Sequence, residues 1–211
     1  MFGKEKEPML YKGYASRQGQ DKGRNEKAPS KGKVTYRGTG TIYVTSLKHG
    51  NGCSYFSLIL ANFLTEYKGA KTSLVQANGI TVKNLISDKI DVFYYPCDLE
   101  RVYSQNYDFI VRDGGVLDEL EEEEEKDLNR ADIKIMMCWP DEDYLRKLAF
   151  FIQNQSVLSN WYFMFNMVPA TKKSQIASIM EDYSTFFLPC IEVTDLDKKL
   201  VTNLYEIIGK G

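Results

Sequence analysis

The sequence has few of the residues that most often build metal or redox sites. Its 211 residues include one histidine and four cysteines, and the cysteines stand far apart in the chain. No CxxC pair or cysteine–histidine cluster is present, which argues against the usual zinc and dithiol redox motifs. Isolated cysteines of this kind favour free thiols in a reducing compartment. We therefore expect a cytoplasmic protein.

Long apolar runs are absent as well. No segment approaches the ~20 uninterrupted apolar residues that a membrane-spanning helix needs. The first ten residues, MFGKEKEPML, lack the apolar core of a signal peptide. The sequence therefore predicts neither secretion nor a transmembrane segment.

Residues 1–39 are poor in apolar residues and rich in basic ones. They contain ten lysine and arginine residues against four aspartate and glutamate residues, about +6, whereas the whole chain has a formal net charge of −2. Such a composition cannot bury enough apolar surface to offset its ordering entropy, so we expect a flexible basic arm. One interpretation is a solvated leader. The other is an arm that binds nucleic acid, an anionic membrane or a partner protein.

From residue 40 onward, short apolar runs alternate with longer helical segments. The short runs do not alternate with polar residues, which is typical of strands buried on both faces of a parallel sheet. Strand-like runs lie at 41–46, 72–77, 107–113, 132–139, 160–168 and 187–193, and helical segments at 55–69, 142–155, 173–183 and 195–209. This order predicts one domain over residues 40–211 with a doubly wound three-layer α/β fold and a mainly parallel sheet.

Two segments of this domain allow more than one interpretation. The five consecutive glutamates at 121–125 fit a solvated helix face or loop better than an acidic binding patch. The last helix carries an apolar stripe, which either packs back on the sheet or lies on a membrane surface. Its few lysines favour packing on the sheet. The stripe consists of Leu196, Leu200, Val201, Leu204, Ile207 and Ile208.

The segment SLKHGNGCSYFS, residues 46–57, joins an apolar strand to an apolar helix. A strand, a glycine-rich loop and a helix that starts at a small hydroxyl residue point backbone N–H groups at a phosphate. Against the strict pattern GxxxxGK[ST], Gly52 takes the last glycine and Ser54 the magnesium-binding hydroxyl. Leu47 replaces the first glycine, and Cys53 replaces the phosphate-binding lysine.

This loop resembles the deviant motif KGGxGKT of ParA/MinD-type partition and positioning ATPases and their CpaE/TadZ-like relatives. Lys48 falls on the signature lysine of that motif, and Ser54 on its hydroxyl residue. The resemblance implies that ATP or ADP is bound by the loop and by one later asparagine. These residues are Lys48, His49, Gly50, Asn51, Gly52, Cys53, Ser54, Tyr55 and Asn166.

Later segments resemble the same family in order and spacing over residues 40–208. YDFIVRDGG is similar to the Walker B strand, which places Asp113 on the metal-facing aspartate and Gly114-Gly115 beside the switch turn. WYFMFNMVP is similar to the strand whose final asparagine reads adenine, here Asn166. The resemblance implies that Ser54 and Asp113 hold magnesium. Asp113 as a turn cap and Asn166 as a strand-end residue remain the alternatives.

The chain departs from the family where the chemistry needs charge. Cys53 supplies no cation against the β- and γ-phosphates, and such electrostatic stabilisation is the largest expected contribution to phosphoryl transfer. We expect a small buried helix-start residue there rather than a reactive thiol. Gln76 and Asn78 stand where the family has aspartates that orient water, and neither can act as a carboxylate base. Hydrolysis should be slow or absent.

These patterns favour a degenerate ParA/MinD-like interaction or positioning module in a partition, conjugation, pilus or secretion system. It binds ATP or ADP with magnesium weakly, or binds no nucleotide. Because the family's signature lysine reaches into a partner subunit, the resemblance also implies a homodimer, although Lys48 could be a plain exposed loop residue. The alternatives are an active ATPase that uses Lys48 in place of the missing lysine, and a nucleic-acid-binding module that acts through residues 1–39.

Overall fold

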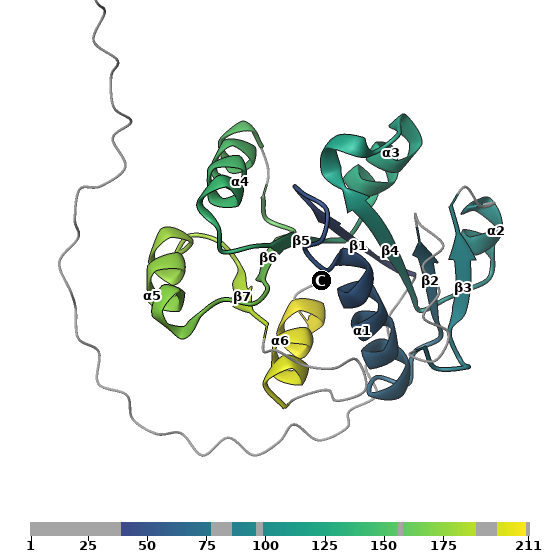
Figure 1. Cartoon of the computed structure of the whole chain (residues 1–211). Coiled ribbons are helices and arrows are strands. Elements are labelled where there is room, and N and C mark those ends of the chain that lie inside the picture. The colour runs from purple at the N-terminus through teal and green to yellow at the C-terminus, as the bar shows by residue number, and fades with distance from the viewer. Residues whose placement is uncertain (1–38, 77–85, 96–98, 156–157, 189–197, 210–211) are drawn as a thin grey trace, which may run out of the picture. The chain divides into compact units, whose positions relative to one another are not determined.

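The computed structural model describes residues 39–76, 86–95, 99–155, 158–188 and 198–209. Their strands form a seven-stranded sheet in the order β3-β2-β4-β1-β5-β6-β7, and every neighbouring pair is parallel (Figure 1). The sequence prediction of a doubly wound α/β fold with a parallel sheet is therefore confirmed. The basic arm predicted over residues 1–39 lies, except for its last residue, outside the described residues.

The elements alternate as the apolar pattern predicts. The strands are β1 (Gly40–Ser46), β2 (Thr72–Gln76), β3 (Asp91–Tyr94), β4 (Phe109–Val116), β5 (Ile133–Cys138), β6 (Trp161–Phe165) and β7 (Thr185–Phe187). The helices are α1 (Cys53–Glu66), α2 (Leu99–Ser104), α3 (Glu122–Arg130), α4 (Glu142–Asn154), α5 (Ala170–Ile179) and α6 (Lys198–Gly209), with a 3₁₀ turn η2 (Leu117–Glu119).

Helices cover both faces of the sheet (Figure 1). On one face, α1 and α6 share a core with alternate residues of the central strands, such as Val44, Val111 and Ile135. On the other face, α3, α4 and α5 pack against the intervening residues, such as Tyr43 and Met136. Helix α1 is buried over most of its length. It therefore fixes the position of the loop 47–52, which joins β1 to α1.

The C-terminal helix belongs to the core. The apolar side chains of α6 at Leu200, Leu204, Ile207 and Ile208 are at most 1% exposed and pack in the same core as α1. The prediction that this stripe packs on the sheet is therefore confirmed, and the membrane-lying alternative for it is wrong. Within the described residues, no helix has the length and apolar character needed to cross a bilayer.

The glutamate run forms a surface helix, as one interpretation predicts. Glu121 caps α3, and its side chain and that of Glu124 make a reciprocal capping box. Carboxylates in the first turn also suit the positive end of the helix dipole. Of the α3 residues only Glu124 and Leu128 are buried, so α3 contributes little to the core.

Two elements and several boundaries differ from the sequence prediction. Strand β3 is an edge strand whose residues are exposed or only partly buried, and its apolar run, Val92 to Tyr95, is only four residues long. Helix α2 has six residues, too few to show a helical period. Strand β7 covers 185–187 rather than 187–193, and residues 189–197 lie outside the described part of the chain.

Strand β4 continues past the point where the sequence predicts its end. Val44 pairs with Asp113 and Ser46 with Val116, so β4 has one residue more than β1 between these pairs. The extra residue makes a bulge at Gly114-Gly115 in place of the turn implied by the family resemblance. A Cβ on Gly114 would overlap the ring of Tyr43, so only glycine fits at this position without a shift of that ring.

Candidate nucleotide-binding site

The loop 47–52 lies at the carboxyl end of β1, where open α/β sheets bind their ligands. Gly52 adopts a left-handed conformation (φ 92°) directly before α1, which a residue with a side chain rarely does. A Cβ on Gly52 would also come within 3.2 Å of the Asn166 amide nitrogen. The fold therefore brings Asn166, from the end of β6, against the loop, as the sequence predicts.

A buried hydrogen-bond network fixes the base of the loop. The Asn51 amide donates to the Ser46 hydroxyl at 2.7 Å, and Ser46 donates to the Met137 carbonyl at 2.9 Å. The Tyr144 hydroxyl donates to the same carbonyl at 2.6 Å and accepts from the Leu47 backbone N–H at 3.4 Å. Sequence reasoning missed Ser46 and Tyr144, because only the fold places α4 beside β1.

Cys53, in the place of the phosphate-binding lysine, faces the interior. It is 7% exposed, and its thiol donates to the Gly115 carbonyl at 3.6 Å. Burial raises the pKa of the Cys53 thiol, and the nearby negative charge of Asp113 raises it further. The thiol is therefore neutral at physiological pH, although it sits at a helix N-terminus that would favour its anion. Cys53 is a buried helix-start residue, as the sequence predicts.

Asp113 and Ser54 meet at the first turn of α1. The Ser54 hydroxyl and the Gly115 backbone N–H both donate to the Asp113 carboxylate, which lowers its pKa, but burial has the larger effect and raises it. Asp113 is 3% exposed, and its Oδ1 has no hydrogen-bond partner in the part of the chain that the structure describes. A hydroxyl beside an unpaired carboxylate oxygen suits magnesium, which prefers oxygen ligands and takes part of its shell from phosphates.

Gln76 is a second polar side chain without partners at the same edge of the sheet. It lies at the end of β2, in register with Asp113 on β4, and is fully buried. Among the described residues, neither its amide oxygen nor its amide nitrogen has a hydrogen-bond partner. Buried polar groups are rarely left unpaired, so this edge is suited to a polar ligand or water. Of the two residues that the sequence places where the family has aspartates, Gln76 thus lies at this edge of the sheet, and Asn78 lies outside the described residues.

Acidic side chains of neighbouring elements contact Lys48 and His49 of the loop. Lys48 pairs with Asp143 in the first turn of α4, and this hydrogen bond raises the pKa of Lys48. The His49 Nε2 lies 2.7 Å from a carboxylate oxygen of Glu119 in η2. Both pairs are largely open to solvent. Tyr55, on the first turn of α1, is 39% exposed.

The described residues contain no group of three or more histidine, cysteine, aspartate or glutamate side chains that could hold a metal alone. A magnesium ion at Ser54 and Asp113 would need further ligands from a nucleotide. Cys53 and Cys138 are both free thiols, which agrees with the expectation of unpaired cysteines for these two positions.

No protein-family model matches the sequence, and no curated protein matches it either. Solved structures do match its fold. A plasmid partition protein from Borrelia burgdorferi bound to AMPPNP has a TM-score of 0.59 at 15% identity, covering 82% of this chain and 99% of the other. The MinD cell division protein of Aquifex aeolicus has a TM-score of 0.61 at 14% identity, covering 82% and 98%. A complex of a Cyanothece McdA variant with ATP has a TM-score of 0.56 at 12% identity, covering 81% and 96%.

The chain thus has a P-loop NTPase fold. Within that class its similarity is to ParA/MinD-type ATPases, as its loop and strand motifs predict. Because these identities lie at 15% or below, the similarity concerns the fold.

Proposed function

We propose that this protein is a degenerate ParA/MinD-like positioning or interaction module. It binds Mg-nucleotide weakly and hydrolyses it slowly or not at all. One observation carries the proposal: Ser54 and Asp113 keep a hydroxyl and an unpaired carboxylate oxygen together at the start of α1, whereas Cys53 turns its neutral thiol to the Gly115 carbonyl. The magnesium ligands are present and the phosphate-binding cation is absent from its usual place.

Nucleotide binding is supported by groups that do not depend on the missing lysine. The first turn of α1 directs its backbone N–H groups and the positive end of the helix dipole toward a phosphate at the loop. Asn166 lies against Gly52, on the side of the loop where the family resemblance expects the base. Two of the structurally similar proteins were solved with AMPPNP or ATP, which supports the same ligand class here.

Slow hydrolysis follows from the charges at the site. A phosphoryl group in transfer carries charge that a lysine or arginine normally stabilises. Lys48 and His49 are held by Asp143 and Glu119, and Gln76 cannot accept a proton from water as a carboxylate would. Turnover should therefore be far below that of a complete site.

A positioning role is supported by the kinds of protein that share the fold, which include plasmid partition and cell division proteins. We accordingly propose a partition, conjugation, pilus or secretion system, a protein partner and a homodimer. Binding of nucleic acid or an anionic membrane by residues 1–39 stays a prediction, because all but the last of those residues lie outside the described part of the chain.

One observation favours a second candidate, an active ATPase that uses Lys48. The Lys48–Asp143 pair is solvent-exposed, with Asp143 61% exposed, so it can be exchanged for a pair with phosphate at little cost. Magnesium-dependent turnover that Lys48→Ala abolishes, and that deletion of residues 1–39 leaves intact, would establish this alternative and refute the pseudo-ATPase.

The decisive experiment is calorimetric titration of the full chain with ATP and ADP, with and without magnesium. We expect weak magnesium-dependent binding that Ser54→Ala and Asp113→Ala both remove. Cys53→Lys should strengthen binding by about 10- to 100-fold, because a hydrogen bond to a charged group contributes about 1.5–3 kcal/mol. Cys53→Met, of similar length but uncharged, is the control. Absence of binding in both the natural chain and Cys53→Lys, with the fold intact, would refute nucleotide binding.

A further inference from the structure

An elongated groove lies between α3 and α4 and reaches Leu47 at the start of the loop 47–52, but neither Ser54 nor Asp113 lines it. It consists of two adjoining cavities of about 570 and 560 Å³ that share four lining residues, Leu117, Asp118, Phe151 and Gln155. We refer to both cavities together as the α3–α4 groove. It is open because α3 buries only two of its side chains and so does not close against α4.

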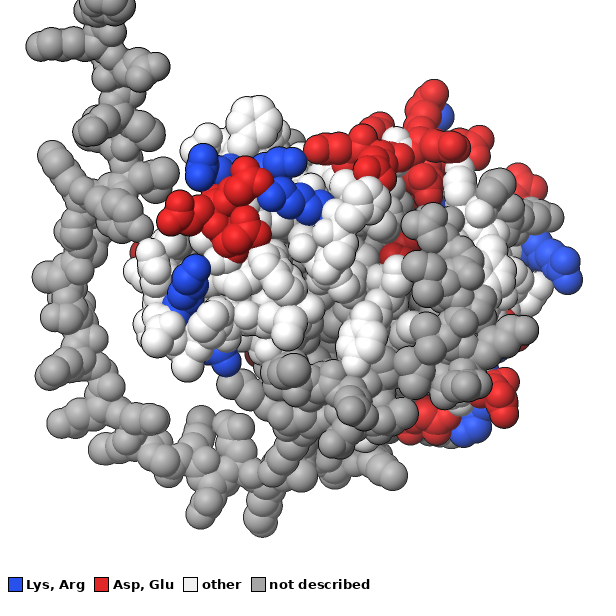
Figure 2. Space-filling view, viewed as in Figure 1, with Lys and Arg blue, Asp and Glu red and all other residues white. Residues whose placement is uncertain are grey.

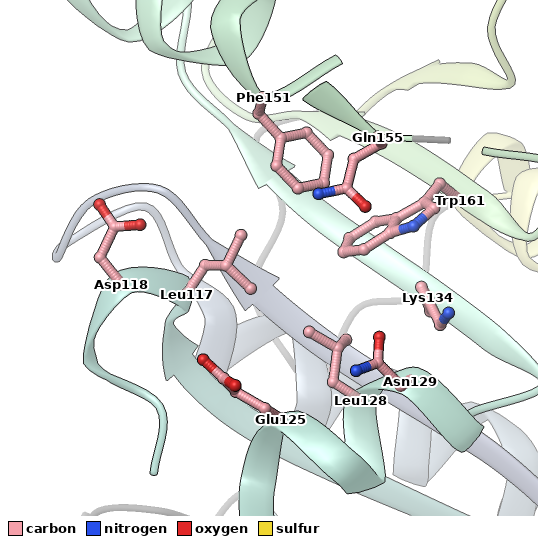
Figure 3. A pocket seen from close by; sticks show the side chains of 9 residues that line it. All are labelled: Leu117, Asp118, Glu125, Leu128, Asn129, Lys134, Phe151, Gln155 and Trp161. Carbon is pink, nitrogen blue, oxygen red and sulfur yellow. The ribbon is translucent and has the colours of Figure 1, made fainter. Parts of the chain in front are cut away.

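Beneath the α3–α4 groove lie buried apolar side chains: Trp161 is 4%, Leu128 6% and Phe151 7% exposed. Trp161 and Phe151 meet edge to face, with ring centroids 5.0 Å apart, and Leu117 and Leu128 lie across from them (Figure 3). Lys134 also lines the floor, with its ammonium 5.8 Å from the Trp161 ring centroid. Asn129, Lys134 and Gln155 also line the groove, so a partner meets a mixed polar and apolar surface.

The two walls of the groove carry opposite charges. Asp118 and Glu125 line it on the η2 and α3 side, and Arg146 and Lys147 line it on the α4 side. In Figure 2, acidic side chains gather over α3, and the basic ones near the groove lie in the region of α4. Among the described residues, Asp118, Glu125 and Lys147 make no ion pair within 4.0 Å, and Arg146 makes only a 4.0 Å contact with Glu142.

Helix α4 itself carries basic and aromatic side chains of the kind that would fit the groove. Arg146, Phe150 and Asn154 follow one another at four-residue spacing and so share one stripe of the helix. Phe150 is 70% exposed, the largest exposed fraction among the large apolar residues described. One face of the molecule thus combines the α3–α4 groove, the exposed Phe150 side chain, basic residues on α4 and acidic residues on η2 and α3. A two-fold symmetric interface requires a surface of this kind, which is complementary to a copy of itself.

We propose that the α3–α4 groove binds α4 of a second copy of this chain. In this symmetric dimer, Phe150 of each copy enters the groove of the other, and Arg146 and Lys147 of each copy face Asp118 and Glu125 of the other. The contact uses neither Ser54 nor Asp113, so it forms without nucleotide. It is therefore independent of the proposed function.

Sedimentation velocity of the full chain, in EDTA and without nucleotide, tests the dimer over a wide range of protein concentration. We expect reversible dimerisation, with a dissociation constant that Phe150→Ala raises at least about tenfold. Ile179→Ala is the matched control, since Ile179 is 53% exposed on α5, away from the groove, and should change nothing.

A charge exchange gives a sharper test. Lys147→Glu and Glu125→Lys should each weaken the dimer at least about tenfold, because each places like charges opposite one another twice. An equimolar mixture of the two variants should dimerise again, since both contacts then join opposite charges. A chain that stays monomeric at all concentrations, a dimer that Phe150→Ala leaves unchanged, or a mixture that fails to dimerise would each overturn the proposal. So would dimerisation that requires nucleotide.

Discussion

The base and the rim of the phosphate loop differ in how they are held. The loop base, Ser46, Asn51 and Cys53, is buried and hydrogen-bonded to groups of β4, β5 and α4. The loop rim, Lys48 and His49, is held only by exposed ion pairs. Buried networks are costly to disturb, whereas exposed pairs contribute little to stability. The loop conformation therefore depends on its base, and the rim is free to change partners.

The largest effect on stability is expected at Gly114. It precedes Gly115, whose carbonyl accepts the hydrogen bond of the Cys53 thiol at the loop base. Gly114→Ala should lower the free energy of unfolding by about 3 kcal/mol or prevent folding, because the added Cβ overlaps the Tyr43 ring. Gly50→Ala at the rim should cost only about 1 kcal/mol, since Gly50 has φ 77° but no neighbour that a Cβ would meet. Urea denaturation of both variants measures the difference. Equal costs would contradict the distinction between base and rim.

Asp113→Asn should raise the stability of the fold and weaken nucleotide binding. Burial raises the pKa of Asp113, so the folded protein holds that proton more tightly than the unfolded chain does. Ionised Asp113 therefore costs stability, and this cost develops as pH rises from the ordinary pKa of aspartate to the raised value. Asparagine can still accept from Ser54 but carries no charge.

We accordingly expect Asp113→Asn to raise the melting temperature at neutral pH by about 2–4 °C, the change that about 1 kcal/mol produces in a domain of this size. The gain should vanish below the ordinary pKa of aspartate. Magnesium-dependent nucleotide binding should fall at least about tenfold, because a charged ligand is lost. Thermal melts across pH, with calorimetry beside them, check both effects. A variant that is less stable at neutral pH would refute this account of Asp113.

Tyr144→Phe tests the connection between the loop base and α4. The variant keeps the ring but removes the hydroxyl that serves the Met137 carbonyl and the Leu47 N–H, so we expect a loss of about 1 kcal/mol. Tyr67→Phe is the control, because Tyr67 is 43% exposed and its hydroxyl makes no hydrogen bond with a described residue. If both variants unfold at the same urea concentration, the hydrogen bonds of the Tyr144 hydroxyl contribute no stability.

The smallest effect is expected at the rim. Lys48→Ala and Asp143→Ala should leave the melting temperature unchanged within error, alone and together, because the pair is exposed and screened by salt. Differential scanning calorimetry at low and high salt is the measurement. If either variant melts at a clearly lower temperature at low salt but not at high salt, the Lys48–Asp143 pair does stabilise the fold, and this expectation is wrong.

Sequence reasoning works where a feature is local. The uninterrupted apolar runs predict the central strands, and the glycine-rich segment around Gly52 predicts a loop between a strand and a helix, which the structure shows. Sequence reasoning misses edge strand β3 because its apolar run is only four residues long and its residues are exposed or partly buried. The Lys48–Asp143 pair escapes for a different reason: it joins residues 95 positions apart, which only the folded sheet brings together.

The Asn51–Ser46 hydrogen bond has an entropic consequence. A loop already fixed to β1 and β5 gives up little conformational freedom when a phosphate arrives, so a ligand need not meet that ordering cost. Replacement of the lysine by Cys53 removes attraction but does not loosen this arrangement. A weakened affinity at this loop should therefore be enthalpic in origin, with an entropy of binding close to that of a complete P-loop.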